Sequence, residues 1–244
     1  MDLVTIVTGG SGGIGAATCR RLAAAGHDVV VGYRSDESGA EKVAADVRSA
    51  GRRAVTVPVD TADAGSVAAL FDRAAAELRA VTGLVNNAGV GSRIGPFADL
   101  DEADLRRVVD VNLVGVLLCC REAARRMGPG GSIVNVSSMA ATLGAPGEYV
   151  HYAASKAGVE AVTVGLSKEL GPAGIRVNTV TPGIIDTGFH GGQSGAPDRA
   201  ERLGPGAPLG RAGRAEEVAA AIAWLLGPEA SYVTGANLRV SGGR

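Results

Sequence analysis

The residues best suited to chemistry are a tyrosine and a lysine, Tyr152 and Lys156, in the segment Tyr-Ala-Ala-Ser-Lys. Side chains at positions i and i+4 share one face of a helix. A free phenol has a pKa of about 10, which is too high for a base near neutral pH. A nearby cation favours the phenolate and lowers that pKa, so the pair can exchange a proton with an alcohol or carbonyl oxygen. Because this spacing is common by chance, a surface tyrosine beside a surface lysine is the alternative interpretation.

Three further polar features precede this pair along the chain. Ser137 and Ser138 end one apolar run, and the segment Asn86–Gly89 ends another. Ligands of open α/β sheets bind outside the carboxyl ends of the strands, which is where these groups are expected. Asn112 interrupts an apolar helical stretch, and a buried amide must find hydrogen-bond partners. Each feature alone is explained by a turn or a satisfied core amide, but their combination in this order indicates a site.

A glycine-rich segment, Thr8–Gly15, lies between the first apolar run and the first helical pattern. Glycines allow a tight turn and let the backbone approach a pyrophosphate at a helix N-terminus, where free N–H groups favour an anion. The segment fits two patterns: G-x-G-x-x-G through Gly10, Gly12 and Gly15, and T-G-x-x-x-G-x-G through Gly9, Gly13 and Gly15. This placement predicts dinucleotide binding, with a purely structural turn as the alternative.

The end of the second predicted strand bears on which dinucleotide is bound. Enzymes that use NAD carry an acidic residue there, about 20 residues after the glycines, which binds the ribose 2′-hydroxyl. Here Tyr33 and Arg34 occupy the strand end, and Arg34 is suited to pair with a 2′-phosphate. Asp36 lies beyond the strand and is interpreted as a loop or helix-cap residue. The sequence therefore favours NADP, with NAD as the second choice.

Short β-branched runs alternate with longer alanine-rich stretches along the whole chain. This alternation predicts βαβ units in an α/β fold, a doubly wound, mostly parallel Rossmann sheet with helices on both faces. We expect a single domain over 1–244, with an irregular Gly- and Pro-rich segment at about 184–208 acting as a substrate lid rather than a plain surface loop. Expected strands are Leu3–Thr8, Asp28–Tyr33, Ala54–Val59, Gly83–Asn86, Ser132–Ser137, Ile175–Val180 and Asn237–Val240. Expected helices are Ile14–Ala25, Gly39–Ala50, Gly65–Ala80 after the cap Asp63, a long helix from Asp101 to about Met127, Tyr152–Leu170 and Glu216–Leu226.

Composition excludes several classes of protein. The 244 residues carry a net charge of −1 with scattered Lys and Arg and only 3% aromatics, so nucleic acid is not expected as a partner. No apolar run approaches the ~20 residues of a membrane span, and the N-terminal segment lacks the features of a secretory signal. The three cysteines, Cys19, Cys119 and Cys120, are expected to be buried thiols of a cytoplasmic protein rather than metal ligands.

With these motifs in place, nearly the whole chain resembles the short-chain dehydrogenase/reductase family. The resemblance is carried by Thr8–Gly15, Asp60, Asn86–Gly89, Asn112, Ser138, Tyr152, Lys156 and Pro182-Gly183. It implies a catalytic tetrad in which Tyr152 exchanges a proton with the substrate and Ser138 orients the substrate oxygen. Lys156 would lower the tyrosine pKa and bind the nicotinamide ribose, and Asn112 would hold a relay water.

The resemblance also implies a set of cofactor contacts. Asp60 would contact the adenine, and Ile185 and Thr187 would meet the carboxamide. The full expected set is Gly9, Ser11, Gly12, Gly13, Ile14, Gly15, Tyr33, Arg34, Ser35, Asp60, Thr61, Asn86, Ala88, Gly89, Tyr152, Lys156, Pro182, Gly183, Ile185 and Thr187. Substrate contacts are expected from Met139, Leu143, Glu148, Tyr149, Phe189, His190 and Gln193.

The expected function is hydride transfer between NADP(H) and a small carbonyl or secondary alcohol substrate. Two alternatives stay open at this point: a non-catalytic dinucleotide-binding protein, and a lyase or epimerase on the same fold. Members of the family are usually dimers or tetramers, so a homo-oligomer is expected, with the helices near 101–127 and 152–170 at an interface. The apolar stretch Val114–Cys120 suits such burial, although burial under its own sheet gives the same pattern.

Overall fold

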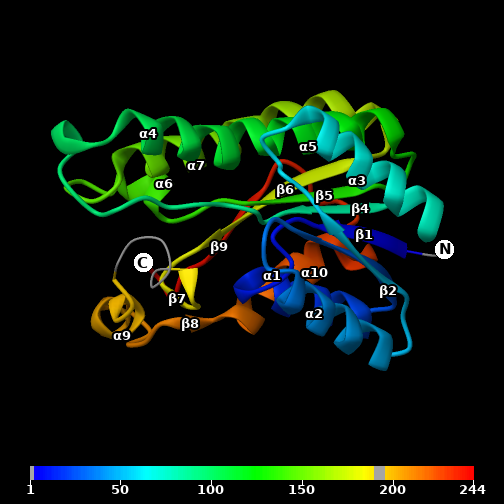
Figure 1. Ribbon diagram of the computed structural model, residues 1–244, viewed down its shortest axis with the longest axis horizontal. Coiled ribbons are helices and arrows are strands. Elements are labelled where there is room, and N and C mark those ends of the chain that lie inside the picture. The colour runs from blue at the N-terminus through cyan, green and yellow to red at the C-terminus, as the bar shows by residue number, and fades with distance from the viewer. Residues whose placement is uncertain (1–2, 190–195) are drawn as a thin grey trace.

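The computed structural model describes residues 3–189 and 196–244. In this part of the chain seven strands form one parallel sheet in the order β3-β2-β1-β4-β5-β6-β9 (Figure 1). Their β-branched sequences suit strands that are buried on both faces. The strands are β1 Leu3–Val7, β2 His27–Tyr33, β3 Ala54–Pro58, β4 Gly83–Asn86, β5 Ser132–Val136, β6 Arg176–Pro182 and β9 Asn237–Val240.

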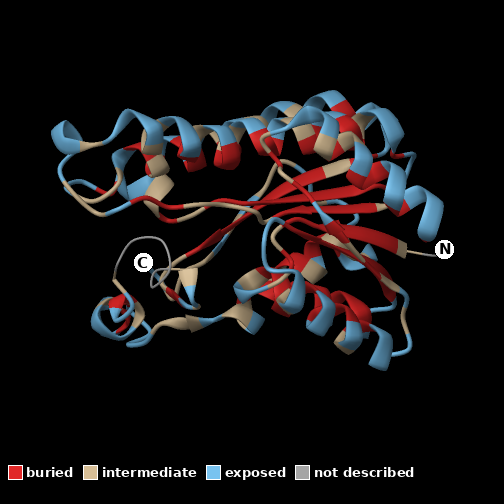
Figure 2. Cartoon of the chain, in the orientation of Figure 1, coloured by how far each residue is buried: buried red, intermediate tan, exposed pale blue. Residues whose placement is uncertain are grey.

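Helices cover both faces of the sheet, which confirms the predicted doubly wound fold. One layer packs on a core that includes Val7 and Leu22, and the other on a core that includes Ile6 and Phe71. Successive strand residues point to opposite faces, so Ile6 and Val7 serve different layers. Figure 2 shows the strands buried between the two layers. The first layer contains α1 Gly13–Ala24, α2 Glu37–Ser49 and α10 Ala215–Leu226; the second contains α3 Ala64–Glu77, α4 Glu102–Val109, α5 Gly115–Arg126 and α7 Val150–Leu170.

The connection from β3 crosses the sheet to β4, which pairs with β1 on the side opposite β2. At such a switch point the loops after neighbouring strands diverge and leave a crevice at their carboxyl ends. The loops after β1, β4, β5 and β6 all reach this edge, so the fold brings the predicted motifs together.

The long helix expected from Asp101 to Met127 is wrong as a single α-helix. Asp101 does cap it, accepting a hydrogen bond from the Ala103 N–H at 2.9 Å. However, a π-helical turn, Asp110–Val114, separates α4 from α5 and contains Asn112. A π turn holds one residue more than an α-helical turn, and such turns are frequent at functional sites.

Two further predicted caps, Asp63 and Asp36, are confirmed, and the second of them shifts the start of α2. Asp63 accepts a hydrogen bond from Ser66 N at the start of α3. Asp36 accepts one from Gly39 N at 2.9 Å, so α2 begins at Glu37 rather than at Gly39. Both carboxylates fill the usual place of a helix N-cap.

The segment 184–208 is more regular than expected. It contains β7 Ile185–Asp186, which pairs with β8 Gly213–Arg214 in a small second sheet, and the short helix α9 Arg199–Leu203. Another short helix, α6 Ala140–Leu143, follows β5. His190 and Gln193 lie outside the described residues.

Among the residues described, no helix has the length and hydropathy needed to cross a bilayer. The same residues contain no cluster of three or more His, Cys, Asp or Glu side chains arranged to hold a metal ion. Cys19, Cys119 and Cys120 are buried and free, and burial raises the pKa of each thiol.

Candidate active site

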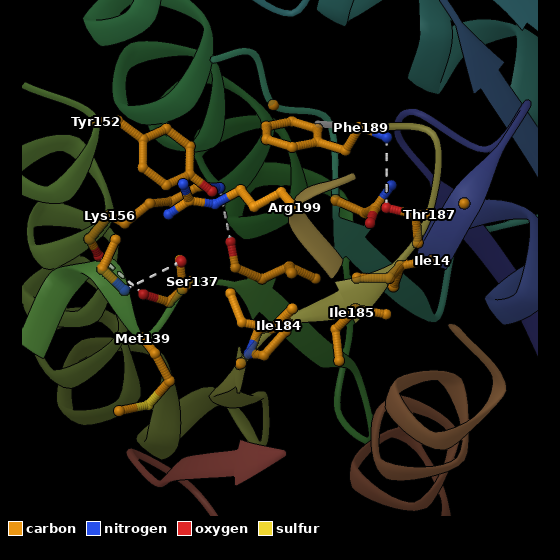
Figure 3. Close-up of a pocket in the computed structure, with 18 of the residues that line it drawn as sticks. Ile14, Ser137, Met139, Tyr152, Lys156, Ile184, Ile185, Thr187, Phe189 and Arg199 are labelled. Carbon is orange, nitrogen blue, oxygen red and sulfur yellow. Dashed lines mark hydrogen bonds between the residues drawn. The ribbon is translucent and has the colours of Figure 1, made fainter. Parts of the chain in front are cut away.

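A cavity of about 870 Å³ opens at the carboxyl edge of the sheet. Its wall joins segments that are far apart in the sequence: the glycine-rich turn after β1, the loop after β4, the serines after β5, helix α7 and the segment after β6 (Figure 3). The expected site residues in this wall are Gly9, Ser11, Gly12, Gly13, Ile14, Ala88, Gly89, Ser138, Tyr152, Lys156, Pro182, Gly183, Ile185 and Thr187. One cavity therefore contains both the phosphate-binding motif and the tyrosine–lysine pair.

The glycine-rich turn is shaped to hold an anion. Gly9 and Gly13 have φ of 65° and 51°, a left-handed conformation that glycine adopts without strain. A Cβ at Gly12 would have no atom within 4 Å, so the turn is open there. Helix α1 begins at Gly13 with no side chain capping its first N–H groups, which leaves them free for a phosphate. A dinucleotide fits this geometry.

Gly15, like Gly10, is a glycine of the predicted patterns that does not line the cavity. It lies inside α1, where an added Cβ would collide with the carbonyl oxygen of Gly9. Its role is therefore close packing between the helix and the turn, one of the uses that glycines have in this motif.

The loop after β4 holds the turn in place through Asn87, which sequence reasoning placed only within its motif. Asn87 Nδ2 donates to the carbonyl oxygens of Thr8 and Gly9 at 3.1 and 3.0 Å. Thr8 Oγ1 accepts from the N–H groups of Asn87 and Ala88, each at 3.1 Å. Asn86 does not reach the cavity: its Nδ2 donates to Asn135 Oδ1 at 2.8 Å inside the sheet.

Tyr152 lies on the first turn of α7, where it is partly buried and lines the cavity. Burial raises the pKa of its phenol to about 12, although a hydrogen bond with Ser138 opposes this rise. Its ring makes an edge-to-face contact with Tyr149, with centroids 5.2 Å apart, and a tilted contact with Phe189 at 6.2 Å. At neutral pH the phenol is protonated and can donate its proton to an oxygen that enters beside Ser138.

Lys156 lies one helical turn further along, and its side chain is buried. The ammonium Nζ donates to the carbonyl oxygen of Val136 at 2.9 Å and lies 5.9 Å from the centroid of the Tyr152 ring. Burial lowers the lysine pKa to about 8, since a low-dielectric environment disfavours the charged form. That Lys156 lowers the tyrosine pKa stays a prediction; in this structure the largest influence on the phenol is burial, which raises its pKa.

Asn112 reaches the site through the main chain of Val90. Its Oδ1 accepts from Val90 N at 2.8 Å and its Nδ2 donates to Val90 O at 2.9 Å. A Cβ on Gly89 would lie 3.4 Å from both Asn112 Oδ1 and Lys156 Nζ, so the two side chains meet at this glycine. Asn112 is fully buried and outside the cavity wall; it fixes the loop that lines the cavity.

The residues expected around the adenine ribose do not line the cavity: Tyr33, Arg34, Ser35, Asp60 and Thr61. Arg34 and Asp60 instead pair with each other, Nη2 to Oδ2 at 2.9 Å, on an exposed surface. Asp36 lines the cavity, although its carboxylate is engaged by the Gly39 N–H at the start of α2.

The far wall of the cavity consists of side chains. Met139, Leu143, Glu148, Tyr149 and Phe189 line it, as the sequence analysis expected. Arg199 from α9 and Arg244 also line it, and both were missed. Arg199 donates to Glu148 through Nη1 at 3.0 Å and Nη2 at 2.6 Å. No spacing or motif marks either arginine in the sequence, because their positions depend on tertiary packing.

Residues 9–244 match the family model described as enoyl-(acyl carrier protein) reductase. The chain belongs to the short-chain dehydrogenase/reductase family. It is 44% identical to the uncharacterized oxidoreductase YgfF of Escherichia coli, over 99% of both chains. It is 46% identical to cis-4-hydroxycyclohexanecarboxylate dehydrogenase of Sinomonas cyclohexanicum, over 99% of this chain and 96% of that protein. Among solved structures, a short chain dehydrogenase from Burkholderia cenocepacia in complex with NADP superposes with a TM-score of 0.92 at 38% identity, covering 98% of this chain and 96% of that one.

As a member of this family the protein is an NAD(P)-dependent oxidoreductase that acts on alcohol and carbonyl groups. The cavity geometry agrees with that reaction, since the anion-binding turn and the buried phenol share one space. The alternatives of a non-catalytic binding protein and of a lyase or epimerase find no support among the relatives.

Proposed function

We propose that the protein interconverts a ketone and a secondary alcohol on a small ring, using NADP(H), with Tyr152 as the proton donor and acceptor. One observation carries this proposal: the protonated Tyr152 phenol, hydrogen-bonded to Ser138, faces the same cavity as the open glycine-rich turn. When bound, the nicotinamide cofactor supplies or accepts the hydride at the carbinol carbon. The protein's own residues supply the proton, the orientation and the binding energy.

In the direction of reduction, Ser138 orients the carbonyl oxygen and the Tyr152 phenol donates its proton as negative charge develops there. A pKa of about 12 keeps that proton on the phenol at neutral pH. In the direction of oxidation the phenolate must form, and the positive charge of Lys156 stabilises it. Lys156 also has N–H donors beyond the one bound to Val136 O, and we assign them to the nicotinamide ribose.

Asn112 lies outside the cavity wall and acts through the loop that it binds. By binding both main-chain groups of Val90, it holds the loop of Ala88 and Gly89 against the cavity. Its Nδ2 also donates to Ser155 Oγ at 3.3 Å. We assign to it the positioning of this loop, together with the relay water that the family resemblance implies.

For the dinucleotide we propose a preference for NADP(H). Arg34 follows β2 directly, and its side chain is 63% exposed. Its partner Asp60 is also exposed, and such pairs contribute only about 0–1 kcal/mol. A doubly charged 2′-phosphate can therefore replace the Asp60 carboxylate. Asp36 is the one carboxylate in the adjoining wall, but its engagement by Gly39 N at 2.9 Å directs it toward α2.

We further propose that the segment 184–208 is a substrate lid, since its residues Phe189 and Arg199 close the far wall of the cavity. A homo-oligomer in the cytoplasm is also proposed. The outer face of α5 and α7 supports the oligomer because Val114, Leu117 and Val164 are 36%, 43% and 45% exposed there. The three free cysteines support a reducing compartment.

The proton transfer is tested by Tyr152→Phe, which removes only the phenolic oxygen. We expect NADPH oxidation with cyclic ketones such as cyclohexanone derivatives to fall by about 10²–10⁴-fold in kcat, while the Kd for NADPH stays within threefold. Tyr149→Phe is the matched control, because it removes a neighbouring phenol from the same wall. Retention of most of the activity in Tyr152→Phe would disprove the assignment.

A further inference from the structure

Arg199 is a buried arginine in the cavity wall. It lies on α9, and only 3% of the residue is exposed. Removing a guanidinium from water is costly unless its N–H groups find acceptors. Burial accordingly lowers its pKa, but the hydrogen bonds that it donates to Glu148, together with the charge of Glu148 and the interaction with Tyr149, more than offset that effect and leave the pKa raised. The charge is therefore permanent, and the cavity wall contains a fixed cation.

The hydrogen bonds of Arg199 leave one edge of its guanidinium unused. Both terminal nitrogens bind Glu148, Nη1 to Oε1 and Nη2 to Oε2. Nε is buried and has no hydrogen-bond partner among residues 3–189 and 196–244. A guanidinium presents five N–H donors in a planar fork, so one edge can bind Glu148 while the Nε edge binds a second carboxylate. Figure 3 shows this side chain reaching into the cavity.

The charges around this edge favour an anion. In the described structure, the pKa of Glu148 is lowered first by its hydrogen bonds from Arg199, and further by the charges of Arg199, Arg244 and Arg202. Arg202 has an acidic neighbour of its own, Asp198, at 3.9 Å. Arg199 and Arg244 both line the cavity, where Glu148 is the carboxylate that faces them. Two guanidinium groups, those of Arg199 and Arg244, thus lie at this wall with one carboxylate side chain, that of Glu148.

The distance from this edge to the reacting group is short. The Arg199 guanidinium carbon lies 5.4 Å from the centroid of the Tyr149 ring, and that ring lies 5.2 Å from the ring of Tyr152. The Tyr149 ring therefore packs against both the cation and the ring of the catalytic phenol. A substrate that places its carbonyl oxygen at Tyr152 and an anion at Arg199 needs a spacer of similar size.

From these observations we infer that Arg199 is a specificity-determining residue that binds a carboxylate on the substrate. The substrate class is an oxo or hydroxy acid in which about one six-membered ring separates the acid from the reacting carbon. This inference rests on the proposed function, because it names the substrate class of the same cavity. A purely structural role, joining α9 to the segment before α7, would use the Glu148 hydrogen bonds but not the Nε edge.

The experiment measures binding rather than turnover. The NADPH-loaded protein is titrated by calorimetry with cyclohexanecarboxylate and with the neutral cyclohexanecarboxamide. Neither compound has a ketone that the enzyme could reduce. A charge-assisted hydrogen bond corresponds to about a ten- to hundredfold difference in affinity. We expect the acid to bind at least tenfold more tightly than the amide. An equal Kd for both would overturn the inference.

Three variants separate recognition from folding. Arg199→Gln should abolish the preference for the acid and leave amide binding unchanged. Arg202→Gln removes the same charge from the same helix outside the cavity wall, and should keep the preference. Glu148→Gln removes the competing carboxylate, so the acid should bind several-fold more tightly. If Arg199→Gln does not fold, the test rests on Glu148→Gln. Unchanged or weaker binding of the acid by Glu148→Gln would then refute the role of Arg199.

A failure of this inference can be distinguished from a failure of the proposed function. Acid binding that depends on Arg199, in a protein that reduces no ketone, would support this inference and refute the proposed function. Reduction of neutral cyclic ketones that depends on Tyr152, without a preference for the acid, would do the reverse.

Discussion

At one end of the cavity the wall is largely main chain, formed by Gly9, Gly12 and Gly13, whereas at the other end it is formed by long side chains such as Glu148, Tyr149 and Arg199. The first end presents N–H groups and open space, which suit a diphosphate regardless of what else the enzyme binds. The second presents charge and aromatic surface, which select one shape of molecule. From this comparison we expect the shared cofactor to be bound by backbone geometry and the individual substrate by side chains.

Of the effects that test this comparison, the largest we expect is a reversed preference between NADP(H) and NAD(H). The double variant Tyr33→Asp with Arg34→Ala removes the phosphate partner and adds an acceptor for the 2′-hydroxyl. A charged hydrogen bond gives about a ten- to hundredfold preference, so the wild type should prefer NADP(H) by that factor and the variant should prefer NAD(H). The measurement is kcat/KM for both cofactors in both proteins, and the ketone KM at saturating cofactor should not move.

A single variant, Asp36→Asn, tests the same preference for NADP(H) by removing a negative charge instead of a positive one. It keeps a cap for the Gly39 N–H and removes the nearby negative charge, so the preference for NADP(H) should grow. A wild type that prefers NAD(H), combined with a loss of that preference in Asp36→Asn, would assign the choice of cofactor to Asp36 instead of Arg34.

A smaller effect is expected from Gly15→Ala at the main-chain end. The added Cβ would collide with the Gly9 carbonyl oxygen and push the turn out of place. Overpacking of this kind costs about 1–3 kcal/mol, which corresponds to roughly a five- to hundredfold weaker Kd for NADPH. Gly165→Ala is the matched control, because this glycine also lies inside a helix, is outside the cavity wall, and a Cβ there meets no atom within 4 Å. Equal losses in both variants would contradict the packing role of Gly15.

The smallest effect concerns Lys156, which lies between the two ends. Its pKa of about 8 means that the ammonium is present below that pH and is lost above it. If the charge is needed, kcat/KM for reduction should be flat below pH 7 and fall about fivefold from pH 8 to pH 9. Tyr152, with a pKa of about 12, stays protonated throughout this range.

Lys156→Arg keeps a cation at every accessible pH. Whatever activity it retains should therefore show its descending limb at higher pH than the wild type. Coincident limbs in the two pH profiles would assign the titration to a different group.

The main-chain end of the cavity was predictable from sequence because its requirements are local. Positive φ at Gly9 and Gly13 and the close packing of Gly15 each demand glycine at one position, so the pattern appears in adjacent residues. Tyr152 and Lys156 were predictable for a similar reason, since one helix fixes their relative positions. The parallel order of the strands followed from the alternation of β-branched and alanine-rich segments.

The rest depended on contacts that no local pattern contains. Arg199 reaches the cavity only because α9 folds back against Glu148, 51 positions earlier in the chain. The pairing of Arg34 with Asp60 joins the segments that follow β2 and β3, and no local pattern in the sequence shows it. The rise in the pKa of Tyr152 came from burial, which the spacing of the pair does not show.

The π turn between α4 and α5 has a consequence for how this helix tolerates change. An extra residue in one turn advances every following side chain by about 100° relative to a straight α-helix. Deleting one residue such as Leu113 would let the ladder of hydrogen bonds run unbroken from Glu102 to Arg126 and make the helix itself more regular. The same deletion would rotate α5 against α4 and separate Asn112 from Val90, which it now binds through both main-chain groups. The π turn thus accompanies the contact between Asn112 and the loop of Val90. A mutation that makes this helix regular is expected to disrupt the candidate active site.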